Sequence, residues 1–151
     1  MNAIKHFLDY AEIRTKITSV FPFFMTLAYL FSAGYQIKAG PTAVFFAGMF
    51  LFDLTATTIN NYFDTKKNAQ TLPLSRKSAK RVTYTLLFLS IFFGLWLVYL
   101  TDPVVLLLGG LCFLFGVLYS FGPVPISHGP YSEVISGFFY GVIIPVIIAY
   151  I

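Results

Sequence analysis

The residues best suited to chemistry are carboxylates and amides that recur on one face of a predicted helix. Asp53, Thr57, Asn60, Asp64 and Asn68 follow one another at spacings of three or four residues, and Asp53 and Asn60 are seven residues apart. At about 3.6 residues per turn, this spacing puts them on one polar stripe. Mg²⁺ takes oxygen ligands and is commonly shared between one or two carboxylates and substrate phosphates. The stripe is therefore a candidate magnesium and phosphate site.

The second half of the stripe offers the denser set of ligands. Asn60 lies one turn before Asp64 and Asn68 one turn after it, so three oxygens can face the same side. The loop that follows is basic and can meet phosphate charge through Lys66, Lys67, Arg76, Lys77, Lys80 and Arg81. In the alternative interpretation, the polar residues end a helix at headgroup level and the lysines set topology.

Asp53 occupies a different place on the stripe. It precedes Asp64 by eleven residues, which is about 16 Å of helix. This puts Asp53 near the middle of a bilayer, where an ionisable side chain is costly and marks a functional site by default. The alternative is a protonated carboxyl, or one paired with its neighbours Thr55, Thr57 and Thr58.

The elements that must carry these residues are membrane helices. The chain has 151 residues, of which 58% are hydrophobic and 11% charged, and a mean hydropathy of +0.79. Charges are nearly absent from five windows, each long enough to cross about 30 Å of hydrocarbon as a helix: Ile17–Ile37, Thr42–Ile59, Val82–Thr101, Pro103–Phe121 and Val134–Ile151. We predict one all-α membrane domain over residues 1–151, a polytopic bundle of about five transmembrane helices.

Residues 1–16 predict a short amphipathic helix at the membrane interface, because Ile4, Phe7, Leu8 and Ala11 recur at helical spacing. Arg14 and Lys16 follow it. The favoured interpretation is that both reach lipid phosphates. The alternative is that they point into a cavity and meet an anionic substrate.

The distribution of charge predicts the orientation. Basic residues gather before the first span and in the 64–81 loop, whereas the loops predicted on the other side hold only Lys38 and Asp102. By the positive-inside rule, the N-terminus and the motif loops face the cytoplasm of a multi-pass cell-membrane protein. The net charge of +4 therefore reflects topology, and we expect no nucleic-acid partner.

Local signals predict where several helices begin and end. Ser75 or Ser78 is placed to cap the third span, and Asp102 to cap the fourth, with Pro103 at its first position. Gly34 marks the end of the first span. Glycines and prolines between residues 122 and 130 predict an irregular loop before the fifth. The single cysteine, Cys112, excludes an internal disulfide.

The motif Asn60-Asn-Tyr-Phe-Asp64-Thr-Lys-Lys-Asn68 resembles the first aspartate-rich motif of the UbiA superfamily of intramembrane prenyltransferases, usually written NDxxDxxxD. Asn60 and Asp64 match it, whereas Asn61 and Asn68 stand where aspartates are usual. Other segments resemble the family as well: Glu12-Ile-Arg14, Thr71-Leu-Pro73-Leu-Ser75, Tyr119-Ser-Phe-Gly-Pro and Gly129-Pro-Tyr-Ser-Glu133. The last two look most like the branch that prenylates 1,4-dihydroxy-2-naphthoate for menaquinone.

The resemblance implies a reaction and roles for residues. Mg²⁺ would bridge the diphosphate of a prenyl donor to the motif, and the allylic carbocation would be attacked by an aromatic ring. Asp64 and Asn60 would be catalytic and metal-proximal, with Asn61 and Asn68 as further metal candidates. The substrate-binding candidates are Arg14, Lys67, Arg76, Lys77, Lys80, Tyr119 and Glu133. Glu133 also suits a purely structural place, the N-terminal turn of a helix.

Two departures from the family pattern shape the expectation. Asn61 and Asn68 lower the negative charge of the site. A second aspartate-rich motif is absent, so the chain resembles the N-terminal half of the family fold. We expect a second half or a second copy as partner, beside the lipid bilayer and the two substrates, and little prenyl transfer by the 151-residue chain alone.

Two other function classes stay open on the sequence. The first is a non-catalytic membrane subunit for binding or assembly, which the missing carboxylates favour. The second is a small transporter that uses Asp53 as its ion site. Substitution of Asp64 would abolish prenyl diphosphate binding in the enzyme and leave a scaffold intact, while substitution of Asp53 would matter most in a transporter.

Overall fold

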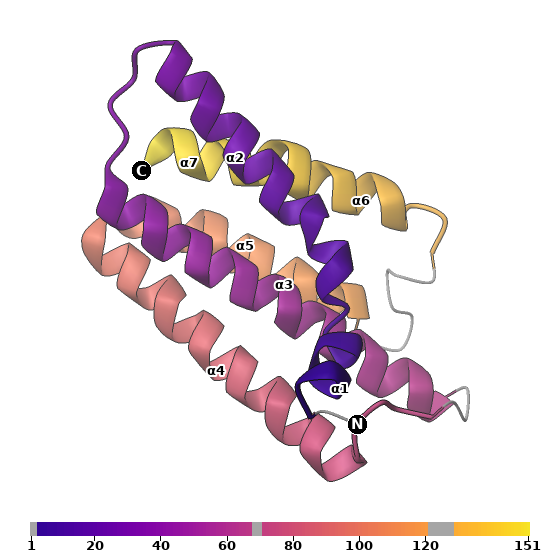
Figure 1. The fold of residues 1–151 in the computed structure, drawn as a ribbon. Helices are drawn as coiled ribbons and strands as arrows, with labels where there is room; N and C mark the ends of the chain where they lie inside the picture. Colours follow the sequence, from indigo (N-terminus) through magenta and orange to yellow (C-terminus); the bar gives the residue numbers. More distant parts are fainter. Residues whose placement is uncertain (1–2, 68–70, 121–128) are drawn as a thin grey trace.

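The computed structural model describes residues 3–67, 71–120 and 129–151, and the elements of this part of the chain are all helices joined by turns, without strands (Figure 1). It confirms an all-α membrane helix bundle. The elements in order are α1 (Ala3–Tyr10), the 3₁₀ turn η1 (Ile13–Lys16), α2 (Ile17–Ser32), α3 (Ala39–Lys67), α4 (Arg76–Leu100), α5 (Pro103–Ser120), α6 (Ser132–Phe138), the π-helical turn η3 (Phe139–Ile143) and α7 (Ile144–Tyr150).

Three described helical segments are long and apolar enough to cross a membrane: Ala39–Lys66, Arg76–Leu100 and Ser132–Tyr150. The last is one continuous span, because η3 joins α6 to α7. The apolar helix over Pro103–Tyr119 is shorter, and α2 has 16 residues. Five spanning helices therefore remain a prediction, while the membrane bundle itself is established.

The predicted first span, Ile17–Ile37, is too long. Helix α2 ends at Ser32 because Gly34 adopts φ +81°, a left-handed conformation that glycine takes without steric cost. The amide of Tyr35 donates to Leu30 O and that of Gly34 to Phe31 O, which is the Schellman pattern of a helix end. Gly34 thus ends the helix as predicted, and apolar composition alone overestimates its length.

Two predicted helix starts are confirmed. The Ser75 hydroxyl accepts a hydrogen bond from the amide of Ser78 at 3.2 Å, at the N-terminus of α4. Asp102 Oδ1 accepts one from the amide of Val104 at 2.7 Å, and Pro103 is the first residue of α5. Each cap satisfies an amide that the helix leaves unpaired. Most of the irregular loop predicted between residues 122 and 130 lies outside the described part, which omits residues 121–128.

Helix α3 is the centre of the bundle (Figure 1). It packs along α4 and also contacts α2 and α5. Gly48 permits the close approach to α4, because a Cβ at this position would lie 3.3 Å from Phe93 Cβ. With 29 residues, α3 is about 43 Å long, longer than the hydrocarbon layer. One of its ends must therefore reach the headgroup region or beyond.

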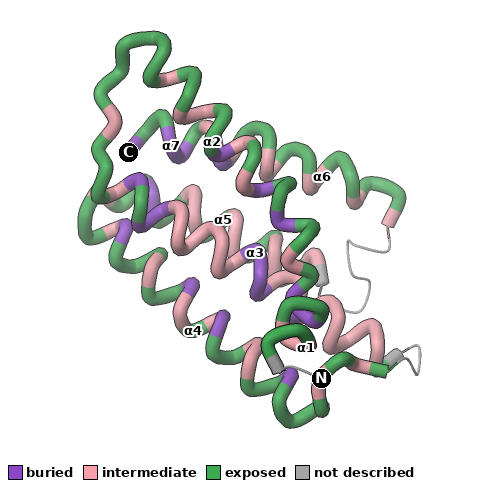
Figure 2. Tube along the Cα trace, viewed as in Figure 1, coloured by how far each residue is buried: buried purple, intermediate pink, exposed green. Residues whose placement is uncertain are grey.

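Burial follows the inner faces of the helices (Figure 2). One apolar cluster joins α2, α3, α4, α5 and α7 around Phe23, Phe45 and Ile147. A smaller apolar cluster holds the N-terminal segment against the bundle, because Ala11 packs with Leu54 of α3 and Leu86 of α4. The amphipathic helix predicted over residues 1–16 is present as α1, but it ends at Tyr10 and is followed by the 3₁₀ turn η1. Tyr10 is fully buried, and the place of α1 at a membrane interface stays a prediction.

Candidate functional site

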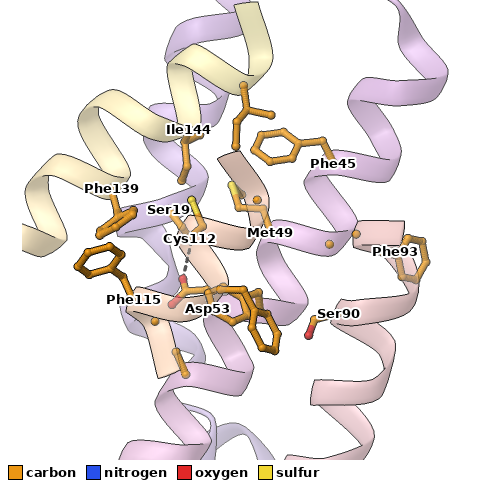
Figure 3. Close-up of a pocket in the computed structure, with 18 of the residues that line it drawn as sticks. Ser19, Phe45, Met49, Asp53, Ser90, Phe93, Cys112, Phe115, Phe139 and Ile144 are labelled. Atoms are coloured by element: carbon orange, nitrogen blue, oxygen red, sulfur yellow. Dashed lines mark hydrogen bonds between the residues drawn. The ribbon is translucent and has the colours of Figure 1, made fainter. Parts of the chain in front are cut away.

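A cavity of about 660 Å³ follows helix α3 through the bundle (Figure 3). Its wall changes character with depth along α3, from Val44 and Phe45 at one end to Asn60 and Asn61 at the other. These positions span about 24 Å of helix. The apolar wall includes Phe45, Phe93, Leu97, Val105, Gly109, Cys112, Ile144 and Ile147. The polar end and the apolar depth together suit a ligand with a polar head and a hydrophobic body.

The polar end gathers residues from three segments. Asn61 Nδ2 donates to Tyr10 O at 3.0 Å and to Glu12 Oε1 at 2.9 Å. Glu12 holds its place with φ 48°, a conformation uncommon for any residue but glycine and asparagine. Glu12, Asn60, Asn61 and Tyr119 all line the cavity. The structure therefore brings Tyr119 of α5 to the same cavity as the two asparagines of α3.

Asn60 has an unused acceptor. Its side-chain Oδ1 is buried and has no hydrogen-bond partner among the described residues. A buried carbonyl oxygen in this state costs free energy, on the order of 1–3 kcal/mol, unless a ligand or water meets it. Because Asn60 lines the cavity, a ligand there can meet this oxygen with a cation or with a hydrogen-bond donor.

The remaining motif residues lie further along α3. Asp64 is half-buried, one turn beyond Asn60. It is not part of the cavity wall as the described residues define it. Lys67 is the last residue of α3, and Asn68 lies outside the described residues. The described part of the chain holds no group of three or more histidines, cysteines or carboxylates placed to bind a metal.

Four of the basic candidates, Arg14, Arg76, Lys77 and Lys80, are exposed, the first in η1 and the others in the first turns of α4. Arg76 Nη1 donates to Tyr62 O of α3 at 2.7 Å, and its guanidinium lies 5.4 Å from the Tyr62 ring centroid. Arg76 therefore also joins α4 to the end of α3. Lys80 lies 5.7 Å from the ring centroid of Tyr84. Lys77 and Arg14 are exposed.

Glu133 is exposed in the first turn of α6. A carboxylate there interacts favourably with the positive end of the helix dipole. It lies outside the cavity wall formed by the described residues. The position of Glu133 thus agrees with a structural role at the N-terminus of α6. It does not support a contact between Glu133 and substrate.

The deepest polar feature is a buried ion pair. Lys16 Nζ lies 3.1 Å from Asp53 Oδ1, and both residues are less than 10% exposed. Ser19 Oγ donates to Asp53 Oδ2 at 2.6 Å, and Tyr140 OH donates to Oδ1 at 3.2 Å. Lys16 also donates to Thr57 Oγ1. The network joins α2, α3 and the π-helical turn at the level of Asp53.

This network corrects two interpretations from the sequence. Lys16 is buried and paired, so the expectation that it reaches lipid phosphates is wrong. Asp53 is bound by Lys16, Ser19 and Tyr140, whereas Thr55 and Thr58 donate to backbone carbonyls of α3 itself. The alternative in which Asp53 pairs with its neighbouring threonines is therefore wrong as well.

Sequence reasoning missed Ser19, Tyr140 and Tyr10 as site residues. Tyr140 lies in a π-helical turn, a feature that backbone patterns in sequence do not reveal and that recurs at functional sites. Tyr10 is fully buried and donates to Thr58 O at 2.8 Å. One signal in the sequence could have pointed to these residues. Burial of the Asp53 carboxylate is costly, and this predicts a cationic or hydrogen-bonding partner elsewhere in the chain.

Comparison with known proteins identifies the family. The sequence model of the UbiA prenyltransferase family matches residues 19–151. The matched region contains the cavity residues of α3 to α7, while α1 and η1 precede it. No curated protein matches the chain, and no solved structure does.

Proposed function

Because the chain belongs to the UbiA prenyltransferase family, we propose that it serves Mg²⁺-dependent transfer of a polyprenyl group from a prenyl diphosphate to an aromatic acceptor. The acceptor class is that of 1,4-dihydroxy-2-naphthoate, and the process is quinone biosynthesis of the menaquinone type. The observation that carries this proposal is the cavity. It joins Asn60 and Asn61 at a polar end to an apolar interior, and thus matches the two halves of a prenyl diphosphate.

The residues at the polar end fit magnesium in part. Asn60 offers a buried oxygen without a partner among the described residues, and Asp64 lies one turn away on α3. Carboxylate and amide oxygens are the ligands Mg²⁺ accepts, together with waters and substrate phosphates. When bound, the ion would neutralise the diphosphate and ease its departure. Asn61 and Asn68 are weaker candidates, because each is an amide where the family motif has an aspartate.

The cavity walls would protect the reaction from water. In the transfer, the bond from the allylic carbon to oxygen breaks and its electron pair leaves with the diphosphate. The ring carbon bonds to the allylic carbon, and the displaced ring proton passes to water at the polar end. Aromatic faces stabilise a nearby cation, and Phe52 and Phe113 present stacked rings, with centroids 5.1 Å apart, in the wall.

The basic residues at the same end would meet the diphosphate charge. Arg76, Lys77 and Lys80 begin α4, and Lys67 ends α3. Arg14 is the more distant candidate, and Glu133 would order the loop before α6. We propose that this end faces the cytoplasm. Two described oxygen groups do not complete a magnesium shell, so a second half or a second copy would supply further ligands.

Binding of geranylgeranyl diphosphate to the purified chain in detergent tests the proposal. We expect affinity to depend on Mg²⁺ and to fall about tenfold or more in Asp64→Asn, which removes an anionic ligand. Asp102→Asn is the matched control, because Asp102 precedes α5 at the opposite end of the bundle. Equal affinity in both variants would refute the proposal and favour a non-catalytic assembly subunit.

A further inference from the structure

The buried network around Asp53 forms part of the cavity wall. Ser19, Asp53, Thr57 and Tyr140 all line the cavity. Figure 3 shows Asp53 and Ser19 joined by their hydrogen bond, among apolar residues of the wall. Asp53 lies seven residues from Asn60 on α3, which is about 10 Å along the helix. The cavity therefore has a second polar zone, separate from the end where the diphosphate is proposed to bind.

The charges of this zone select the kind of ligand. Lys16 pairs with Asp53, yet it stands behind the cavity wall that the described residues form. The Asp53 carboxylate lines the cavity and is neutralised by its ion pair with Lys16, so a ligand there meets oxygen atoms without net charge. Neither an anion nor a cation finds an uncompensated charge there, and burying either would be costly. A neutral group that donates a hydrogen bond fits this zone.

Tyr140 is the residue best placed to receive that hydrogen bond. Its hydroxyl proton is committed to Asp53 Oδ1 at 3.2 Å, and the Thr18 side chain also hydrogen-bonds the phenol oxygen, which leaves one further lone pair of that oxygen to accept. A hydroxyl that donates to a carboxylate becomes a stronger acceptor itself, because hydrogen bonds in a chain polarise one another. The π-helical turn Phe139–Ile143 that carries Tyr140 interrupts an otherwise regular span, as such turns do at functional sites.

We propose that Tyr140, held by Asp53, is the subsite that binds a ring hydroxyl of the aromatic acceptor. This inference rests on the proposed function and adds the place of the second substrate. The prenyl diphosphate would lie toward Asn60, and the hydroxylated ring at the depth of Asp53. Lys16 and Ser19 are positioning residues, because they fix the Asp53 carboxylate and do not themselves receive the ring.

Cys112 provides a direct readout. It is the only cysteine in the chain, and it lines the cavity with Asp53 and Ser19 (Figure 3). We would measure how 1-naphthol and 1-methylnaphthalene slow its alkylation by N-ethylmaleimide in detergent. The two probes have similar shape, and only the first carries a hydroxyl. We expect 1-naphthol to protect at an about five- to tenfold lower concentration, as one hydrogen bond to a polarised acceptor implies.

Tyr140→Phe removes the accepting oxygen and should erase this difference between the probes. Tyr99→Phe is the matched control, because Tyr99 is 86% exposed, and it should behave as wild type. The double variant Lys16→Met, Asp53→Leu replaces the ion pair by apolar side chains and should also erase the difference, even if Tyr140→Phe fails to fold. A preference for 1-naphthol that persists in either folded variant overturns the inference.

Geranylgeranyl diphosphate with Mg²⁺ separates this inference from the proposed function. We expect it to protect Cys112 in wild type, in Tyr140→Phe and in the double variant, because its head binds at the other polar zone. If it fails to protect the wild type, the proposed function fails. If it protects all three while the hydroxyl preference is unchanged by the substitutions, only the ring subsite is wrong.

Discussion

At the scale of single residues, the buried pair of Lys16 and Asp53 dominates the energetics of the site. Two charges removed from water are costly, and their attraction balances that cost only with good geometry and further hydrogen bonds. Here Ser19 and Tyr140 supply such bonds to Asp53. The pair is therefore a unit, in which loss of one member leaves the other charge buried and unpaired.

Asp53→Leu alone should destabilise the protein by about 3–5 kcal/mol, the usual cost of removing one partner of a buried pair. The double variant Lys16→Met, Asp53→Leu should recover most of this loss, since both charges are then gone. Unfolding in a detergent series measures both variants. A double variant as unstable as Asp53→Leu would contradict the assignment of the pair.

Asn60 and Asn61 should separate binding from stability. Asn60→Leu removes a buried oxygen without a described partner, so we expect stability to rise by up to about 1–3 kcal/mol and Mg²⁺-dependent ligand binding to weaken. Asn61→Leu breaks the bonds to Tyr10 and Glu12 and should cost about 1–3 kcal/mol of stability. Thermal unfolding and ligand titration on the same samples check both expectations, which fail if the two variants behave alike.

The sequence was a partial guide at this scale. The depth of Asp53 was readable from its eleven-residue distance to Asp64, and depth alone marked it as exceptional. Its partner was not readable, because Lys16 lies 37 residues away in a flank where a basic residue ordinarily contacts lipid. Tertiary packing decides which segment contacts the middle of α3, and a local sequence pattern does not predict this contact.

At the scale of elements, α1 is fixed to the bundle by Tyr10. The ring is fully buried, and its hydroxyl contacts Thr58 O of α3 and Thr83 Oγ1 of α4. Burial raises the pKa of Tyr10 above its usual value of 10.0. The folded state therefore holds this proton more tightly than the unfolded state does.

The pH dependence of α1 docking follows from that shift. Because the folded pKa is raised, the stabilisation from Tyr10 is complete below pH 10.0 and is lost as pH rises above it. Tyr10→Phe should be about 1–3 kcal/mol less stable at neutral pH, since two hydrogen bonds are lost. Its stability should fall less than that of wild type in alkali. Parallel alkaline unfolding curves for the two proteins would contradict this account.

The contact between α3 and α5 depends on the glycine at position 116, which leaves room for the ring of Phe52. A Cβ at Gly116 would overlap Cζ of the Phe52 ring, so Gly116→Ala forces the ring to move. We expect a cost of about 1–3 kcal/mol and recovery when Phe52→Leu is added. Gly109→Ala is the control, because nothing lies within 4 Å of its added Cβ. Equal stability of the two alanine variants, measured by thermal unfolding, would show that the contact is looser than described.

Elements were the level best predicted from sequence. The helix ends marked by Ser75, Asp102 and Gly34 agree with the observed ones, because caps and glycine turns act locally. The apolar window Thr42–Ile59 was too short, because α3 continues through polar residues to Lys67. The first window overran its helix by continuing past Gly34. The π-helical turn at Phe139–Ile143 was not predicted, because it depends on how α6 and α7 join within the bundle.

At the scale of the whole molecule, one long helix organises the cavity. Residues Val44 to Asn61 of α3 form one wall, and α4, α5 and the α6–α7 span supply the others (Figure 1). Family membership was foreseen from the motif in α3, and the family match confirms it. The cavity was not foreseeable in this detail, since its lining combines residues far apart in the chain.

The orientation of a prenyl diphosphate in this cavity is the central claim, and protection of Cys112 tests it most directly. Geranylgeranyl diphosphate with Mg²⁺ should slow alkylation of Cys112 by about tenfold or more, because the tail covers the apolar wall that holds this thiol. Inorganic diphosphate with Mg²⁺ should leave the rate unchanged, because it reaches only the polar end. Asp64→Asn should remove the protection. Equal protection by inorganic diphosphate, or full protection in Asp64→Asn, would contradict the proposed orientation.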